Sequence, residues 1–221
     1  MDRMKTDSLI TQLGDNLTPV KRLLQVRFWV PCWVLLSTAY VILMTLYLGS
    51  FRPGAWGQLL TAPRFALELS LGALAMLSAT LVCLNSSIPG GLKTWMLWLQ
   101  RGALMLWLAV FSSAFLNPPL AVSMLGKRDG CIWESFLLSA PPLLFLLLLT
   151  YRRYPMSHTS TAFHAALAAG LIPALTMQLA CMYDPLHALK FHLLPVAYLA
   201  MATIVISLAW RSIRRLRSVA S

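Results

Sequence analysis

Charged side chains are scarce in this sequence: Lys, Arg, Asp and Glu make up 11% of its 221 residues. A soluble globular domain usually carries about 25%, so the composition excludes an ordinary soluble enzyme or binding domain. Acidic residues are scarcer still, with 7 Asp and Glu against 18 Lys and Arg. Glu68 is the one clear acid within the apolar stretches, whereas pumps and exchangers usually hold several ionisable groups in the membrane.

Motifs that carry enzyme chemistry are missing as well. The four cysteines form no C-x-x-C pair, which argues against a membrane thiol oxidoreductase. The sequence has no P-loop, no dinucleotide-binding glycine pattern and no convincing arrangement of Ser, His and Asp. It therefore predicts a protein that is not an enzyme.

Apolar runs are what the sequence has in abundance, with 58% hydrophobic residues. A helix needs about 20 apolar residues to cross a bilayer, because the hydrocarbon offers no water to the backbone. The candidate spans are Phe28–Leu48, Phe65–Leu84, Trp98–Leu116, Phe136–Tyr151, Phe163–Cys181 and His192–Trp210. The fourth is short unless it begins near Cys131, which would draw Glu134 into the interface. We predict an all-α integral membrane protein, a six-transmembrane-helix bundle with a short cytoplasmic N-terminal helix.

Basic residues sort to one side of these spans. With the N-terminus inside, 13 of the 18 Lys and Arg residues lie on inner segments and 5 on outer ones. The outer five are Arg52, Arg64, Lys127, Arg128 and Lys190. This asymmetry places both termini in the cytoplasm. The net charge of +11 then belongs to membrane flanks that face anionic lipid, so we expect no direct binding of nucleic acid.

The segment before the first span has a helical design of its own. Asp7 or Ser8 can cap a short helix, and Thr18 followed by Pro19 is typical of the start of a second one. An apolar stripe at helical spacing is formed by Leu9, Ile10, Leu13 and Leu17. Such a stripe lies on the bilayer or docks on a protein. The acidic residues of this segment favour a protein partner, because a lipid-lying helix is usually rich in Lys and Arg.

The cysteines fall into two pairs. Cys32 and Cys83 lie within spans near the inner face, where small apolar side chains need no further role. Cys131 and Cys181 lie at the outer mouths of different spans, and two hairpins could bring them together. A bacterial periplasm would expose these two thiols to oxidants and incoming metal ions.

Polar side chains accompany this outer pair of thiols. They are Asp129, Glu134, Asp184, His187 and His192. Thiolate, imidazole and carboxylate are the ligands expected for a zinc-like transition-metal ion. Asp184 followed by Pro185 is equally typical of a helix N-cap and first position. The spacing is not a compact zinc motif, so a structural disulfide or ordinary interfacial residues remain alternatives to metal or redox sensing.

The whole chain resembles the NrsF family, the negative regulators of extracytoplasmic-function sigma factors. The resemblance rests on the opening MKTDSLITQLGDNLTPVKRL, with K-T-D, an apolar helix and then P-V-K-R. It also rests on the six spans and on one outer cysteine in each of two later hairpins. Members of this family hold a sigma factor at the bacterial inner (cytoplasmic) membrane and release it under heavy-metal or oxidative stress.

The resemblance implies roles for particular residues of this chain. The stress-sensing pair would be Cys131 and Cys181, and no cofactor would be required beyond a possible metal ion there. Residues 1–27 would form the cytoplasmic sigma-binding segment, and 28–221 the transmembrane domain with short loops and a basic cytoplasmic tail. The partner-binding residues would be Lys5, Asp7, Leu9, Ile10, Leu13, Leu17, Pro19 and Val20.

A rival interpretation is a small metal or ion transporter of the inner membrane, in which the Cys and His residues form an uptake site. Transport predicts metal flux into vesicles and a polar path through the bundle. An anti-sigma factor predicts a neighbouring sigma-factor gene and co-purification with its product.

Overall fold

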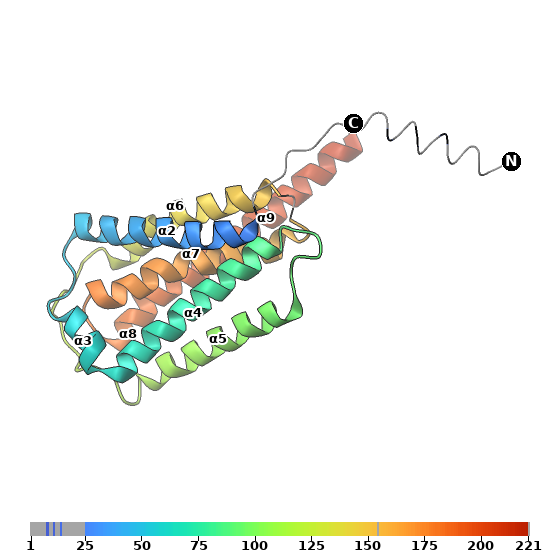
Figure 1. The fold of residues 1–221 in the computed structure, drawn as a ribbon. Coiled ribbons are helices and arrows are strands. Elements are labelled where there is room, and N and C mark those ends of the chain that lie inside the picture. The colour runs from blue at the N-terminus through green and yellow to red at the C-terminus, as the bar shows by residue number, and fades with distance from the viewer. Residues whose placement is uncertain (1–7, 9–10, 12–13, 15–24, 154, 221) are drawn as a thin grey trace.

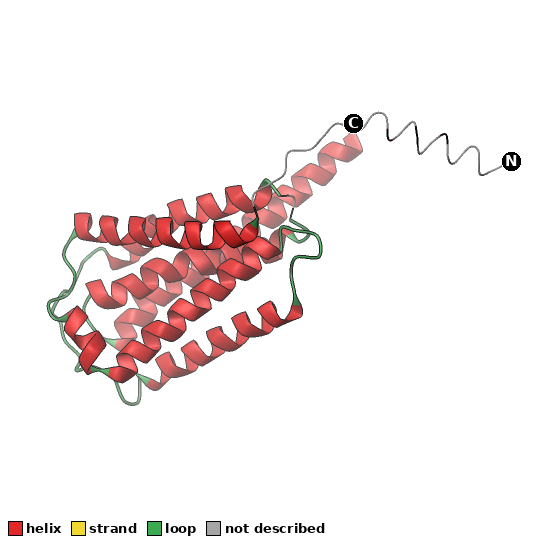
Figure 2. Cartoon of the chain, viewed as in Figure 1, coloured by secondary structure: helices red, strands yellow, loops and turns green. Residues whose placement is uncertain are grey.

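The chain forms a bundle of long helices (Figure 1). The computed structural model describes residues 8, 11, 14, 25–153 and 155–220. Figure 2 shows helices and loops, and no strand, in this part of the chain. The helices are α2 (Val26–Leu48), α3 (Ala55–Thr61), α4 (Pro63–Asn85), α5 (Thr94–Ser113), α6 (Cys131–Tyr151), α7 (His158–Ala180), α8 (Pro185–Ala188), the π-helical turn η1 (Leu189–Leu193) and α9 (Leu194–Ala220). Six helical segments are long and apolar enough to cross a membrane, which confirms the predicted all-α membrane bundle.

Helix α7 is the centre of the bundle. It is buried along most of its length and packs against α4, α6 and α9. Alanines fill much of this helix, and Gly170 lies so near α9 that a Cβ there would be 3.0 Å from Val196 Cγ1. Small residues let membrane helices approach closely and gain dispersion contacts that lipid cannot supply. The sequence of α7 therefore suits the most crowded position in the fold.

Helices α2 and α5 lie at the rim of the bundle (Figure 1). Large apolar side chains on both are exposed, among them Leu35 and Tyr47 on α2 and Trp98 and Met105 on α5. Such surfaces are expected where a helix meets lipid tails rather than protein.

Capping residues decide where two of the spans begin. Helix α7 starts at His158, ahead of the predicted Phe163, because Ser157 Oγ accepts a hydrogen bond from Ser160 N at 3.4 Å. The last span starts at Pro185 rather than at His192, since the Asp-Pro pair makes an N-cap and first helical position.

The other spans differ from their predicted bounds by smaller amounts. Helix α6 starts at Cys131, the longer of the two alternatives, and Glu134 therefore lies in its first turn. Helix α5 is shifted by about one turn toward the N-terminus, because the chain turns directly after Ser113. Helices α2 and α4 start two residues before the predicted Phe28 and Phe65.

The two ends of the bundle carry different features. Cys131, Cys181, α3 and α8 lie at one end, which we call the thiol end (Figure 1). The start of α2 and the last turns of α9 lie at the opposite end, which we call the tail end. The predicted outer segments all fall at the thiol end, and the predicted inner loops at the tail end.

Reporter fusions can test which end faces the cytoplasm. We expect fusions after Gly126 and Tyr183 to read as external and fusions after Gly91 and Ser157 to read as internal, because basic residues concentrate at the tail end. A phosphatase reporter active only outside and a fluorescent reporter active only inside would provide the measurement. An internal reading at Tyr183 would overturn the placement of both outer cysteines.

Candidate metal and thiol site

Two loops at the thiol end bring distant cysteines together. Ser123 N donates a hydrogen bond to Tyr183 O at 3.1 Å, which pairs the segment before α6 with the segment after α7. Cys181 ends α7 in extended backbone, and Cys131 is the first residue of α6. Arg52 Nη1 donates to Cys181 O at 3.0 Å and so fixes the backbone beside the thiol. Both cysteines therefore lie at helix ends, and contacts between segments distant in the sequence hold the two ends together.

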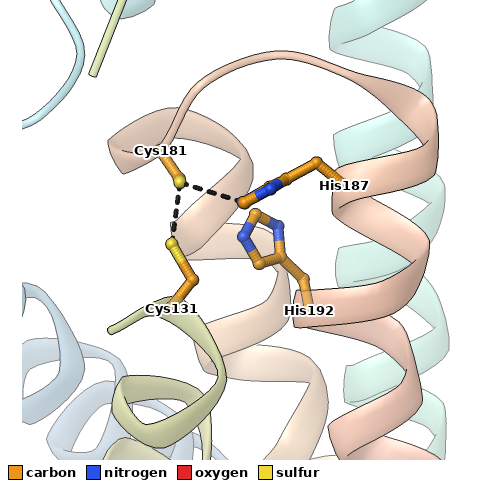
Figure 3. A group of neighbouring side chains, drawn as sticks. All are labelled: Cys131, Cys181, His187 and His192. Atoms are coloured by element: carbon orange, nitrogen blue, oxygen red, sulfur yellow. Dashed lines mark hydrogen bonds between the residues drawn. The ribbon is translucent and has the colours of Figure 1, made fainter. Parts of the chain in front are cut away.

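Two thiols and two imidazoles converge at this point (Figure 3). The sulfur atoms of Cys131 and Cys181 lie 2.8 Å apart. His187 Nε2 lies 3.3 Å from Cys181 Sγ. With His192 included, one potential ligand atom from each residue lies within 4.8 Å of the others. We call these four residues the thiol–imidazole cluster.

A cap and a helical irregularity place the two imidazoles. Asp184 Oδ1 accepts from Leu186 N at 3.1 Å and Oδ2 from His187 N at 3.3 Å, which starts α8. Residues five apart would point about 140° away from each other on a regular α-helix. The π-helical turn η1 widens the helix between His187 and His192. Their ring centroids consequently lie 5.2 Å apart.

His192 has unusual surroundings for a polar side chain. It is 1% exposed, and neither of its ring nitrogens has a hydrogen-bond partner in the part of the chain that the structure describes. A buried polar group without a partner is unfavourable by a few kcal/mol and is rare in native proteins. These orphaned nitrogens, facing two thiols and a second imidazole, indicate a place for a ligand.

The electrostatics of the cluster favour a thiolate at Cys181. The hydrogen bond from Cys131 lowers the pKa of the Cys181 thiol, and the neighbouring imidazoles of His187 and His192 add to this against the opposing effect of burial. A pKa below the ordinary value favours the thiolate of Cys181 at neutral pH. The thiolate, not the thiol, is the metal ligand and nucleophile.

The three predicted carboxylates do not join the cluster. Asp184 is occupied as the cap of α8. Glu134 forms an ion pair with Arg128 at 2.8 Å. Asp129 is exposed at the mouth of a cavity of about 200 Å³ that Cys131 and His187 also line. The candidate metal ligands are therefore the two cysteine sulfur atoms and one ring nitrogen from each histidine of the cluster.

The remaining predicted residues lie elsewhere. Cys83 is buried in α4 and donates to Thr161 O at 3.6 Å, and Cys32 is a partly exposed residue of α2. Neither belongs to the cluster. All eight predicted partner-binding residues, from Lys5 to Val20, lie outside the described residues.

The donor set fits a zinc-like ion. Two thiolates and two imidazoles are a ligand set of structural zinc sites, which are tetrahedral. Soft sulfur ligands disfavour Mg²⁺ and Ca²⁺, which prefer oxygen. The same two thiols can also lose two electrons and two protons to an oxidant and form a disulfide.

Two arginines around the cluster were missed by sequence reasoning. Arg52 is buried and also donates from Nη2 to Gln58 Oε1 at 2.7 Å. Arg128 precedes Cys131 by three residues and contacts three helices. The sequence pattern identifies both only as outer basic residues. Their position on the outer side, where basic residues are few, could have marked these two arginines as unusual.

The family model described as "NrsF: Negative regulator of sigma F" matches residues 13–214. Searches of curated proteins and of solved structures found no match.

Proposed function

Since the chain belongs to the NrsF family of negative regulators of sigma F, we propose that it holds a sigma factor at the membrane and releases it when the thiol–imidazole cluster changes state. The family makes this protein an anti-sigma factor with a sigma factor as its partner. We propose further that the partner is of the extracytoplasmic-function class and that the membrane is the bacterial inner membrane. This function requires no catalysis.

The observation that carries the sensing proposal is the convergence of Cys131, Cys181, His187 and His192. Cys131 begins α6, Cys181 follows α7, and the two histidines lie in α8 and η1. One potential ligand atom from each of the four lies within 4.8 Å of the others. A purely structural role would not need orphaned nitrogens on a buried His192. Zinc-like ions and thiol oxidants would both act on this cluster, the first by binding all four residues and the second by joining the two sulfurs.

In the proposed orientation the cluster faces the periplasm, where metal ions and oxidants arrive from outside. The basic asymmetry of the sequence favours a periplasmic thiol end and a cytoplasmic tail end. The sigma-binding head, residues 1–27, would then lie in the cytoplasm with its partner. The cluster and the sigma factor would then lie on opposite sides of the hydrocarbon core, which is about 30 Å thick.

Zinc titration with proton counting tests the metal arm of this proposal. Two ordinary thiols would release nearly two protons per bound ion at pH 7.5, since the usual pKa of a thiol is about 8.5. The lowered pKa of Cys181 leaves one proton to be lost, the one on Cys131. We therefore expect one Zn²⁺ per chain and about one proton released, measured by calorimetry of reduced protein in buffers of different ionisation enthalpy.

Matched variants assign the ligands in the same titration. His187→Ala should weaken zinc binding by more than about tenfold, since loss of even a supporting group commonly has that effect. Asp129→Asn should bind as wild type does, because Asp129 lies outside the cluster. Equal weakening by both changes would mean that the cluster is not the binding site.

A further inference from the structure

We propose that Arg128 couples the thiol–imidazole cluster to helix α2, so that a change at Cys131 moves the helix to which the sigma-binding head is attached. This inference rests on the proposed function and names the element that carries its signal. Arg128 is a positioning residue here: it contacts no metal ligand through its side chain and acts through α2.

Helix α2 is well placed to transmit a change at the cluster to the sigma-binding head. It begins at Val26, directly after the N-terminal segment. Most of its residues are exposed or half-buried, and its fully buried residues recur at roughly four-residue spacing: Val26, Trp33, Ser37, Val41 and Thr45. Because α2 packs less extensively on each of its neighbours than α4, α6 and α9 pack on α7, a small shift or tilt of α2 disturbs fewer contacts than a shift of those helices. Movement of α2 necessarily moves the point where the head joins the bundle.

Two side-chain hydrogen bonds tie α2 to its surroundings, and both lead to α6. Trp33 Nε1, in the first half of α2, donates to Pro142 O at 3.1 Å near the middle of α6. Arg128 Nη2 donates to Thr45 O at 3.2 Å in the last turn, and Arg128 Nη1 pairs with Glu134 Oε2 at 2.8 Å in the first turn of α6. Helix α6 begins with Cys131, so α2 is linked to the same helix that carries one of the two thiols.

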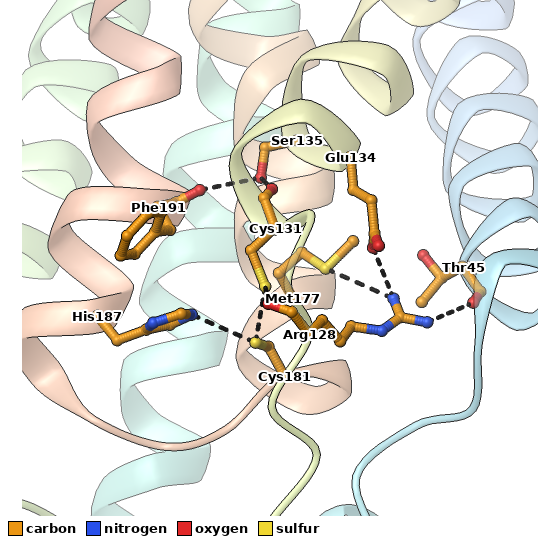
Figure 4. A network of polar contacts seen from close by, with 9 residues as sticks. All are labelled: Thr45, Arg128, Cys131, Glu134, Ser135, Met177, Cys181, His187 and Phe191. Carbon is orange, nitrogen blue, oxygen red and sulfur yellow. Dashed lines mark hydrogen bonds and ion pairs between the residues drawn. The ribbon is translucent and has the colours of Figure 1, made fainter. Parts of the chain in front are cut away.

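The guanidinium of Arg128 bridges three helices at the thiol end (Figure 4). Besides α2 and α6 it reaches Met177 Sδ of α7 at 4.0 Å. The last turn of α2 has no basic residue of its own, although carbonyl groups at a helix C-terminus favour a cation. Arg128 supplies that charge from another segment, and its side chain is only 10% exposed. Hydrogen bonds of a buried charge are among the stronger ones in proteins.

Gly49 provides the space for this bridge. A Cβ built at Gly49 would collide with the guanidinium of Arg128, and Nη2 would be the atom nearest to it. The backbone of Gly49 is extended, so room, not backbone freedom, is what the glycine supplies. The Gly49→Ala change should therefore displace the Arg128 side chain without altering any charge.

The link from Arg128 to the cluster is the contact between its carbonyl group and the Cys131 thiol. Cys131 Sγ lies 3.3 Å from Arg128 O and 2.8 Å from Cys181 Sγ. A metal ion bound by the cluster would draw Cys131 Sγ toward the other three ligands. A disulfide would draw it toward Cys181, as an oxidant takes two electrons, one from each sulfur, and the thiol protons pass to solvent. Either movement displaces the start of α6 and the neighbouring Arg128, which holds α2 through Thr45 O.

The experiment compares cluster occupancy with sigma-factor release in purified complexes. The variants are Arg128→Gln and Gly49→Ala, with Lys127→Gln as the control. Lys127 is the exposed neighbour in the same loop, and its replacement removes the same charge. Zn²⁺ binding is followed by calorimetry, thiol oxidation by diamide is followed by free-thiol counting, and release is followed by the sigma factor lost from immobilised complex.

We expect wild type and Lys127→Gln to lose sigma-factor affinity by about 5- to 150-fold on Zn²⁺ or diamide treatment, the range of typical coupling between sites. Arg128→Gln and Gly49→Ala should bind Zn²⁺ within about threefold of wild type, as expected for changes away from the ligands. Their sigma-factor affinity should change by less than about twofold on the same treatment.

Three outcomes would overturn the proposal. Release from both variants at the wild-type level would show that α2 does not depend on Arg128. Loss of zinc binding in both variants would mean that Arg128 shapes the cluster itself. If Arg128→Gln fails to insert in the membrane, sigma-factor release and zinc binding are judged from Gly49→Ala alone. Wild type that holds its sigma factor under both treatments would refute the proposed function, and this inference with it.

Discussion

Replacing Cys131 and Cys181 together by Ser is expected to abolish the response to metal ions and oxidants while repression persists. A serine hydroxyl neither forms a disulfide nor serves as a soft ligand. Serine is nearly the size of cysteine, so the helix ends should keep their packing. Because the two sulfurs lie 2.8 Å apart, either single change should already remove most of the response.

A sigma-dependent reporter gene gives the measurement. In the double variant the ratio of treated to untreated reporter activity should fall to about one, as expected when the ligand has no differential affinity for the two states. The matched control is Cys32→Ser/Cys83→Ser, which removes two thiols outside the cluster. Serine can keep the hydrogen bond of Cys83 to Thr161 O, so this control should respond as wild type does. A full response in the Cys131→Ser/Cys181→Ser protein would refute the sensing role.

The second large effect is expected at the N-terminal head. The double change Leu9→Asp/Leu13→Asp should release the sigma factor constitutively while the bundle still inserts. The apolar stripe there is too small to form a core of its own and needs a partner surface. Burying one Leu side chain is worth roughly 1.5–3 kcal/mol, so losing two should weaken binding by a few hundred-fold or more.

Co-purification of the sigma factor with tagged protein tests this prediction. Thr11→Asp is the matched control, because Thr11 is exposed and lies between the two leucines in sequence. It adds a carboxylate to the same segment and leaves the apolar stripe intact. If the Leu9→Asp/Leu13→Asp protein retains the sigma factor, the head is not the binding element, and the tail-end loops at Lys93 and Arg152 become the better candidates.

The membrane architecture was predictable from sequence because it depends on local properties. Span length and apolar content are read from each segment by itself. The start of the last span was likewise indicated by Asp184 and Pro185, whose capping roles are local. Boundaries such as that of α7 were missed because a single cap at Ser157 outweighs the apolar pattern.

The composition of the cluster was only partly predictable. Both cysteines and both histidines were among the candidates, but so were three carboxylates that lie outside the cluster. Which of them meet depends on the pairing of two loops and on the π-helical turn η1. Such an irregularity follows from packing in three dimensions and leaves no periodic signal in the sequence. The long-range contacts of Arg128 were invisible for the same reason.

In the proposed metal-bound state, the depth of the cluster would set the rate at which the ion is exchanged. Cys181, Cys131 and His192 are 0%, 2% and 1% exposed, and His187 alone is half-open to the outside. A departing ion must break its bonds to three enclosed ligands before it meets water, and affinity differences of this kind reside mostly in the rate of departure. Under the proposed function, an occupied cluster would outlast the exposure that filled it, so the response would depend on the duration of the exposure as well as on its dose.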